Sequence, residues 1–307
     1  MNLVLWPTVK LVHPKPATLA SFDGNRKKAH IEFPFDSQFG SIFKSQVSVK
    51  PASLKCFCIK NEVTDNPTKG FSVLASEIPW ESGNLWSTMA TYIFILHIPL
   101  GIGGLSISAY VLKQPVMDPQ TQALSLLVVQ ILELTGTLLL LKATSKPQYN
   151  LKNFFKADKS PEKRNWLLAS ALGFLVLISL VFLTSLLADT FVGHKAVNPI
   201  LKEILLSSNL SKVACVLVYC IITPLLEEGV YRGFLLTSLA ATMNWLPAVL
   251  ISSAIFSAAH FSGENFIQLF VTGCVLGCSY CWTGNLSSSI LVHSLYNALT
   301  LTVTFLP

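Results

Sequence analysis

From residue 86 to residue 305 the sequence is a succession of apolar stretches separated by short polar segments. A helix needs about 20 mainly apolar residues to cross the hydrocarbon core of a bilayer. The stretches that approach or reach this length lie at residues 86–112, 121–141, 166–187, 212–240, 245–260, 266–283 and 285–305. They predict an all-α, polytopic transmembrane helix bundle of about seven helices. We expect a transmembrane domain at 86–307, preceded by a polar linker at 61–85.

The composition agrees with a membrane protein. Hydrophobic residues make up 51% of the chain and charged residues only 12%, whereas ordinary soluble domains carry about 25% charged residues. The net charge of +6 is concentrated in the first sixty residues, which hold nine Lys and Arg against three Asp and Glu. Elsewhere the basic residues form no patch interleaved with aromatic residues, so nucleic acid is not an expected partner. The partner predicted by composition is the lipid bilayer.

Residues 1–60 are poor in acidic residues and contain several prolines, which do not allow a long stable helix. We interpret them as a disordered N-terminal leader and a removable targeting (transit) peptide. The early apolar stretch is broken by Pro7 and Lys10, which disfavours a secretory signal. Plastid import fits better, with processing near Cys56 or Cys58, and mitochondrial import comes second. We therefore expect a chloroplast membrane protein; a retained, disordered leader would instead be compatible with the endoplasmic reticulum.

The fourth apolar stretch contains two adjacent glutamates and an arginine, in the segment LLEEGVYRGFLL at residues 225–236. An ionised side chain at the centre of a membrane helix costs about 2.5 to 3.5 kcal/mol on insertion scales, and such residues usually serve a function. Glu228 and Arg232 are four residues apart and can pair on one helix face, which is also compatible with a purely structural ion pair. Glu227 is then left as a candidate general base. Pro224 predicts a bend or looser winding just before it.

Histidine and asparagine recur in the later apolar stretches. The segment FSAAH places Phe256 and His260 one helical turn apart, and HSLYN does the same for His293 and Asn297. One such histidine alone is more often a packing residue than a catalyst. Three polar elements on separate helices, with almost no other ionisable groups nearby, favour a shared intramembrane active site. Glu133 in the second stretch is isolated in sequence, and we assign it no role.

Together these motifs resemble those of a known family. In chain order, EEGVYR, FSAAH and HSLYN match the patterns Glu-Glu-x-x-x-Arg, Phe-x-x-x-His and His-x-x-x-Asn. The sequence thus resembles the CAAX protease and bacteriocin-processing (CPBP) family of intramembrane proteases, which includes the type II CAAX prenyl endopeptidases. The resemblance covers residues 208–305. Together with the leader it suggests an organelle-targeted, plant-like member of the family.

The resemblance implies an intramembrane endopeptidase that acts on a protein or prenylated-peptide substrate at the membrane. At the positions that match the family motifs, Glu227 and His260 are expected to activate a water molecule for attack on a peptide carbonyl. His293 and Asn297 are expected to stabilise the resulting oxyanion, as hydrogen-bond donors can. The residues expected to support the site are Glu228, Arg232 and Phe256.

Two alternatives stay open. Glu227, His260 and His293 could hold zinc with a water in the fourth position. We favour chemistry without a cofactor, because Asn297 suits an oxyanion donor better than a zinc ligand, and no His-Glu-x-x-His helix is present. The second alternative is a non-proteolytic membrane scaffold, which would keep the bundle and bind a partner in its polar centre. The sequence does not indicate the oligomeric state.

Overall fold

The computed structural model of this chain describes residues 70–74, 80, 82–146, 154–155, 164–192 and 199–305. The predicted leader, its processing site and most of the predicted linker lie outside these residues. Within them the backbone is mainly helical and forms no strand, apart from an isolated antiparallel bridge between Trp80 and Ser145. The prediction of an all-α helix bundle is confirmed.

Each of the seven predicted apolar stretches contains a long helical segment. The segments are α1 with the following π-helical stretch, Leu85–Ile102, extended by α2 (Gly104–Val111); α3 (Pro119–Thr144); α4 (Trp166–Val192); the continuous helix Asn209–Ala240; α9 (Trp245–Ala259); α10 (Phe266–Thr283); and α11 (Leu286–Phe305). One further helix, α5 (Pro199–Ser207), is absent from the prediction. It precedes the central helix and packs against it.

Five helical segments in the described part of the chain are long and apolar enough to cross a membrane. They are Leu85–Ile102, Pro119–Thr144, Trp166–Leu186, Asn209–Ala240 and Gly263–Thr283. The two other predicted spans are helical but fall outside this set. Helix α9 has 15 residues, a length of about 22 Å against a hydrocarbon core of about 30 Å. Helix α11 is continuous, but its apolar sequence is interrupted by serine, threonine, histidine and asparagine residues. Many of these are buried in the bundle.

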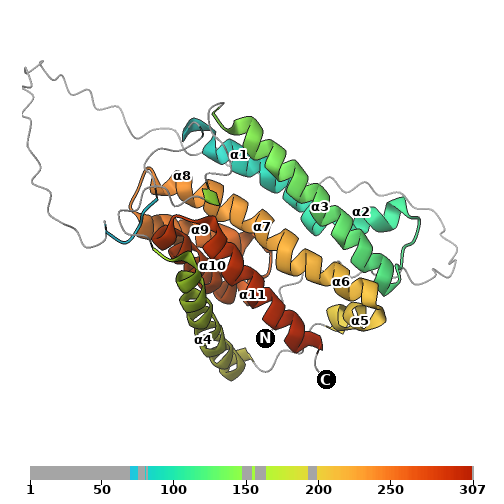
Figure 1. The fold of residues 1–307 in the computed structure, drawn as a ribbon. Helices are drawn as coiled ribbons and strands as arrows, with labels where there is room; N and C mark the ends of the chain where they lie inside the picture. The colour runs from blue at the N-terminus through green and yellow to red at the C-terminus, as the bar shows by residue number, and fades with distance from the viewer. Residues whose placement is uncertain are drawn as a thin grey trace, which may run out of the picture. The chain divides into compact units, whose positions relative to one another are not determined.

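The helix Asn209–Ala240 is the centre of the bundle (Figure 1). It contains α6 (Asn209–Leu217), α7 (Thr223–Glu228) and α8 (Thr237–Ala240). Helix α3 packs against α6 and α7, α11 also packs against α7, and α9 packs against α8 and the stretch just before it. Within the central helix 56% of the apolar window is buried, compared with 22 to 33% in the three preceding spans. Polar groups on this helix are therefore kept from lipid by its neighbours.

The central helix changes its winding on both sides of the paired glutamates. The stretches Val218–Ile222 and Gly229–Leu236 are π-helical, and α7 lies between them. Pro224 sits in the first turn of α7, where its missing N–H is tolerated after the wider preceding turn. The looser winding predicted before Glu227 is therefore observed. π-helical insertions are frequent at functional sites.

Close packing between α9 and α10 depends on two glycines. A Cβ atom added at Gly273 would lie 2.8 Å from the Cβ of Ser253, and one added at Gly277 would lie 3.1 Å from a methyl group of Val249. Any side chain at either position would push α9 outward. Since His260 directly follows the last residue of α9, these glycines also help to place the histidine.

A short segment before the first span, residues 70–74, is fixed to one end of the bundle by Arg164. The guanidinium donates hydrogen bonds to the carbonyls of Gly70 (2.7 Å), Phe71 (2.6 Å) and Trp282 (2.9 Å). The backbone N–H of Val73 also donates to the carbonyl of Cys281, at 3.0 Å. Arg164 therefore links this segment to the end of α10.

We expect Arg164→Ala to release the segment and make Phe71 accessible to chymotrypsin. A hydrogen bond to a charged group contributes about 1.5 to 3 kcal/mol. Taking the lower value, because the site is partly exposed, cleavage of the detergent-solubilised protein should accelerate about tenfold. Arg164→Lys should accelerate cleavage less, because lysine keeps the positive charge but lacks the planar guanidinium that donates several hydrogen bonds at once. Cleavage of Arg164→Ala at the wild-type rate would contradict this role.

Candidate active site

The predicted site residues come from three separate parts of the fold. Glu227 and Glu228 end α7, and Arg232 lies one turn later in the π-helical stretch. His260 caps the C-terminal end of α9. The remaining two, His293 and Asn297, lie one turn apart on α11. All six residues are at most 8% exposed.

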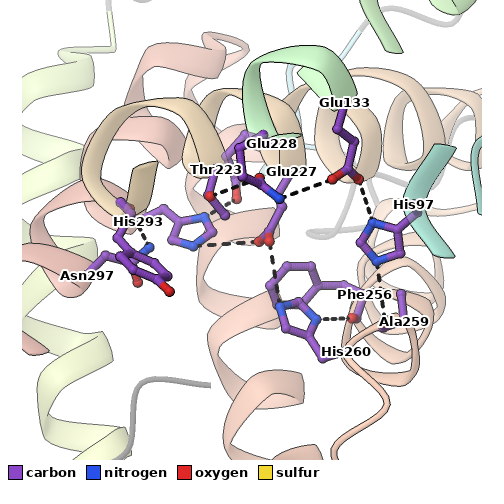
Figure 2. Close-up of polar contacts among 12 residues, drawn as sticks. His97, Glu133, Thr223, Glu227, Glu228, Phe256, Ala259, His260, His293 and Asn297 are labelled. Carbon is purple, nitrogen blue, oxygen red and sulfur yellow. Dashed lines mark hydrogen bonds and ion pairs between the residues drawn. The ribbon is translucent and has the colours of Figure 1, made fainter. Parts of the chain in front are cut away.

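Glu227 lies between two imidazole rings (Figure 2). Its Oε1 is 3.7 Å from Nε2 of His260, and its Oε2 is 3.7 Å from Nε2 of His293. These separations are too long for direct hydrogen bonds. They are short enough for one water oxygen to lie within hydrogen-bonding distance of the carboxylate and an imidazole together. The arrangement suits a carboxylate and a histidine that act on a shared water.

Glu228 has a different set of partners from Glu227. Its Oε1 accepts hydrogen bonds from Nη1 of Arg232 and Nδ1 of His293, each at 2.9 Å. The predicted pairing of Glu228 with Arg232 is therefore present. The contact with His293 is an addition to that prediction: it fixes the proton on Nδ1 and turns Nε2 toward Glu227. A neutral His293 presents a lone pair to Glu227, whereas a protonated one presents an N–H donor.

Phe256 contacts both His260 and Arg232. Its carbonyl accepts a hydrogen bond from Nδ1 of His260 at 2.8 Å, so a neutral His260 directs the lone pair of Nε2 toward Glu227. Its ring lies edge-on to His260, with centroids 4.7 Å apart, and beneath the guanidinium of Arg232 at 4.5 Å. The cation–π contact and the ion pair together compensate the burial of Arg232.

Asn297 points to a different neighbour from the other predicted catalytic residues. Its Nδ2 donates a hydrogen bond to the carbonyl of Tyr219 at 2.8 Å, within the π-helical stretch Val218–Ile222. The amide has a second N–H with which it can act as a donor. The structure thus brings Glu227, His260 and His293 together, and it ties Asn297 to the central helix one turn away from His293.

A second buried polar cluster lies beside this site, and the sequence analysis missed it. Glu133 on α3 is 2.8 Å from Nδ1 of His97, which lies in the π-helical part of the first span. Both side chains are at most 1% exposed. The signal in the sequence was one ionisable residue in each of the first two apolar stretches, His97 and Glu133. Their partnership was not visible, because 36 residues and a helix crossing separate them.

The donor set of the site matches what zinc uses, because imidazole nitrogens and carboxylate oxygens are its common ligands. The contact between Glu228 and Nδ1 of His293 also resembles the outer hydrogen bond that orients metal-bound histidines. Across the described ranges, however, no three or more His, Cys, Asp and Glu side chains are already arranged to hold a metal ion. The arrangement of Glu227, His260 and His293 with their 3.7 Å separations would have to contract around an ion.

Comparisons with known proteins give an independent view of this site. Residues 209–299 match the family model described as type II CAAX prenyl endopeptidase Rce1-like. The chain is also 28% identical over 229 residues to the membrane-embedded CAAX protease MroQ of Staphylococcus aureus (strain USA300). That match covers 69% of this chain and 87% of the relative. No solved structure shows a significant match.

The fold and site define an integral membrane protein with a carboxylate- and histidine-lined centre. The matched region contains every residue of the predicted site, and both comparisons support a protease role. The family model and the bacterial relative both support a likeness to the CAAX protease and bacteriocin-processing family.

Proposed function

We propose that the protein is an intramembrane endopeptidase that hydrolyses a peptide bond in a membrane-associated protein. The observation that carries the proposal is the position of the Glu227 carboxylate, 3.7 Å from Nε2 of both His260 and His293 in a buried setting. Each imidazole has its other nitrogen engaged, so both rings are held with Nε2 toward the carboxylate. A buried general base with oriented partners suits the activation of water.

The reaction follows from these contacts. A water held by Glu227 and His260 attacks the peptide carbonyl carbon, a new C–O bond forms, and the carbonyl electron pair moves to oxygen. Glu227 takes a proton from this water and later delivers it to the amide nitrogen as the C–N bond breaks. A protonated His293, supported by Glu228, donates from Nε2 to the oxyanion, and the free N–H of Asn297 is the second proposed donor.

Zinc is the alternative cofactor, and Glu227, His260 and His293 would be its ligands. A bound zinc ion would supply a water of lowered pKa and would polarise the peptide carbonyl. We favour the reaction without it. Treatment of the solubilised protein with a strong chelator tests the choice: retained cleavage supports the glutamate mechanism, whereas loss that is reversed by zinc supports the metal.

The proposed substrate is the tail or a membrane-adjacent segment of a protein, within the CAAX-type class that both comparisons name. A prenylated peptide is the specific form of this class to test. The proposed location is a chloroplast membrane, with the endoplasmic reticulum or mitochondrial membrane as alternatives. This location rests on the composition of residues 1–60, nine of which are basic and three acidic.

A comparison of protein termini in membranes tests the proposed function directly. Wild type and Glu227→Gln are expressed at equal levels in a null background, and new N- and C-termini are quantified. Termini that appear with the wild type and are lost in Glu227→Gln would establish proteolysis and identify substrates. Identical termini, with full rescue of the null phenotype by Glu227→Gln, would reject the proposed protease function and favour a non-proteolytic scaffold.

Asn297→Ala is expected to lower kcat about 10²- to 10³-fold, the usual effect of removing one oxyanion donor. KM should change little, because the interaction forms mainly in the transition state. Thr300→Ala is the matched control, since Thr300 is also buried on α11 and its hydroxyl donates to the carbonyl of Tyr296. Steady-state cleavage of a peptide identified by the termini comparison provides the measurement. Equal kcat values for the two variants would exclude Asn297 as a donor.

A further inference from the structure

The second polar cluster connects the two helices that carry Glu227 and His260. His97 and Glu133 form its centre, with Nδ1 of His97 2.8 Å from Oε1 of Glu133. The hydroxyl of Tyr92 lies 3.0 Å from the same nitrogen and 3.4 Å from the same oxygen. The reaction proposed above uses none of these three groups. Their burial at this position therefore requires another explanation.

One end of the cluster reaches His260 through the backbone. Nε2 of His97 is 3.3 Å from the carbonyl oxygen of Ala259, the last residue of α9 (Figure 2). Carbonyls in the last turn of a helix lack partners within the helix, so His97 supplies one from a different span. The next residue is His260, and Phe261 after it has a φ of +50°, so the chain turns away at once. The end of α9 is thus held from outside.

The other end reaches the helix of Glu227. Oε2 of Glu133 accepts a hydrogen bond from Nε2 of Gln130 at 3.2 Å, and Oε1 of Gln130 accepts one from the hydroxyl of Thr223 at 3.3 Å. Thr223 lies one helical turn before Glu227. We call the chain of contacts through Thr223, Gln130, Glu133, His97 and Ala259 the Glu133 network. It joins the two elements whose relative position sets the distance between Glu227 and His260.

The positions of the protons in this network can be deduced from the carbonyl acceptor at its end. The carbonyl of Ala259 can only accept, so Nε2 of His97 carries a proton. The short contact between Nδ1 and Oε1 of Glu133 then requires one further proton between them. The pair is therefore either imidazolium with carboxylate or neutral imidazole with carboxylic acid. In both states it has no net charge, which makes its burial far less costly than that of a lone carboxylate.

We propose that His97 and Glu133 are positioning residues, which hold the C-terminal end of α9 so that Nε2 of His260 stays directed at Glu227. This role rests on the proposed protease function. It adds two residues that lie outside the matched region 209–299 and belong to the first two spans. A displacement of about 1 Å in a catalytic group can lower a rate about 100-fold, so the contact at Ala259 affects the reaction without touching substrate.

Four variants of the full chain test this role. His97→Phe keeps a ring but removes the donor to Ala259, and Glu133→Leu removes the partner of His97. Glu133→Gln is the conservative variant, because an amide can donate to Nδ1 of a neutral His97 and accept from Gln130. Thr137→Val is the matched control, since Thr137 is buried on α3 one turn after Glu133 and its hydroxyl makes no hydrogen bond in the structure.

Two measurements are made on protein in detergent. For cleavage, His97→Phe and Glu133→Leu should lower kcat about 10- to 100-fold with less than about a twofold change in KM. Glu133→Gln and Thr137→Val should stay within about threefold of wild type. For hydrogen–deuterium exchange, the backbone amides of residues 260–262 should exchange about tenfold faster in His97→Phe and Glu133→Leu only.

The outcomes separate this role from the protease function itself. Wild type that cleaves no more than Glu227→Gln refutes the function, and the exchange measurement then still decides whether His97 holds the end of α9. Glu227-dependent cleavage that is unchanged in His97→Phe overturns the positioning role. Equal losses in Glu133→Gln and Glu133→Leu also overturn it, because the network would then act through charge and not through placement.

Discussion

Glu227→Gln is expected to lower the rate of peptide cleavage about 10²- to 10⁴-fold, the range for loss of a general base. The amide has nearly the shape of the carboxylate but cannot take a proton from water. The fold should survive, because an uncharged amide costs less to bury than an ionised carboxylate, and Glu227 is only 3% exposed. Single-turnover cleavage of an identified substrate peptide measures the effect, together with the thermal midpoint in detergent.

Glu203→Gln on α5 is the matched control, since it makes the same chemical change at an exposed position. It should cleave at the wild-type rate. A Glu227→Gln protein within about tenfold of wild type would mean that Glu227 is not the base. A lower thermal midpoint of several degrees would instead indicate that Glu227 has a structural role.

The largest loss of stability is expected for Arg232→Leu. It leaves the carboxylate of Glu228, which is 0% exposed, without its strongest partner. Breaking a buried ion pair by removing one partner costs about 3 to 5 kcal/mol. The lower value applies here, because Nδ1 of His293 remains as a donor to the same oxygen. The thermal midpoint should fall about 6 to 12 °C, at about 2 to 4 °C per kcal/mol.

The double variant Glu228→Leu, Arg232→Leu separates stability from activity. Replacing both charges with apolar groups is often neutral or stabilising, so the thermal midpoint should return close to that of wild type. Cleavage should stay low, because His293 has lost the acceptor that fixes its Nδ1 proton. A double variant as unstable as Arg232→Leu would show that packing, not an unpaired charge, causes the loss. Full cleavage by the double variant would show that Glu228 does not support His293.

Much of the fold could be predicted because hydropathy alone fixes where the long helices lie. The predicted stretch 121–141 became α3, Pro119–Thr144, and the stretch 266–283 matches α10. Helix α5 escaped prediction because nine residues that bury only part of one face give no membrane-like signal. The short length of α9 was predicted: the apolar stretch 245–260 differs from the helix Trp245–Ala259 only by His260, which caps the helix end.

The site was predictable only where its contacts are local in sequence. The pair Glu228 and Arg232 follows from four-residue spacing, and so does the contact between His260 and Phe256. The choice of Glu228 as the partner of His293 Nδ1 depends on the rotation of α11 against the central helix, which spacing does not encode. Likewise, the contact of Asn297 with Tyr219 depends on the π-helical winding before Pro224.

Arg164 has a consequence for how the protein is made. Its hydrogen bonds connect Phe71 to Arg164, which lies 93 positions later in the chain, and to Trp282, which lies 211 positions later. Residues 70–74 therefore cannot reach their final position until α10 has been synthesised and inserted. During most of translation this segment therefore lacks its hydrogen-bond partners, and its docking is among the last steps of assembly. A nascent chain stopped before Trp282 would keep the segment open to a protease, so its protection reports that insertion is complete.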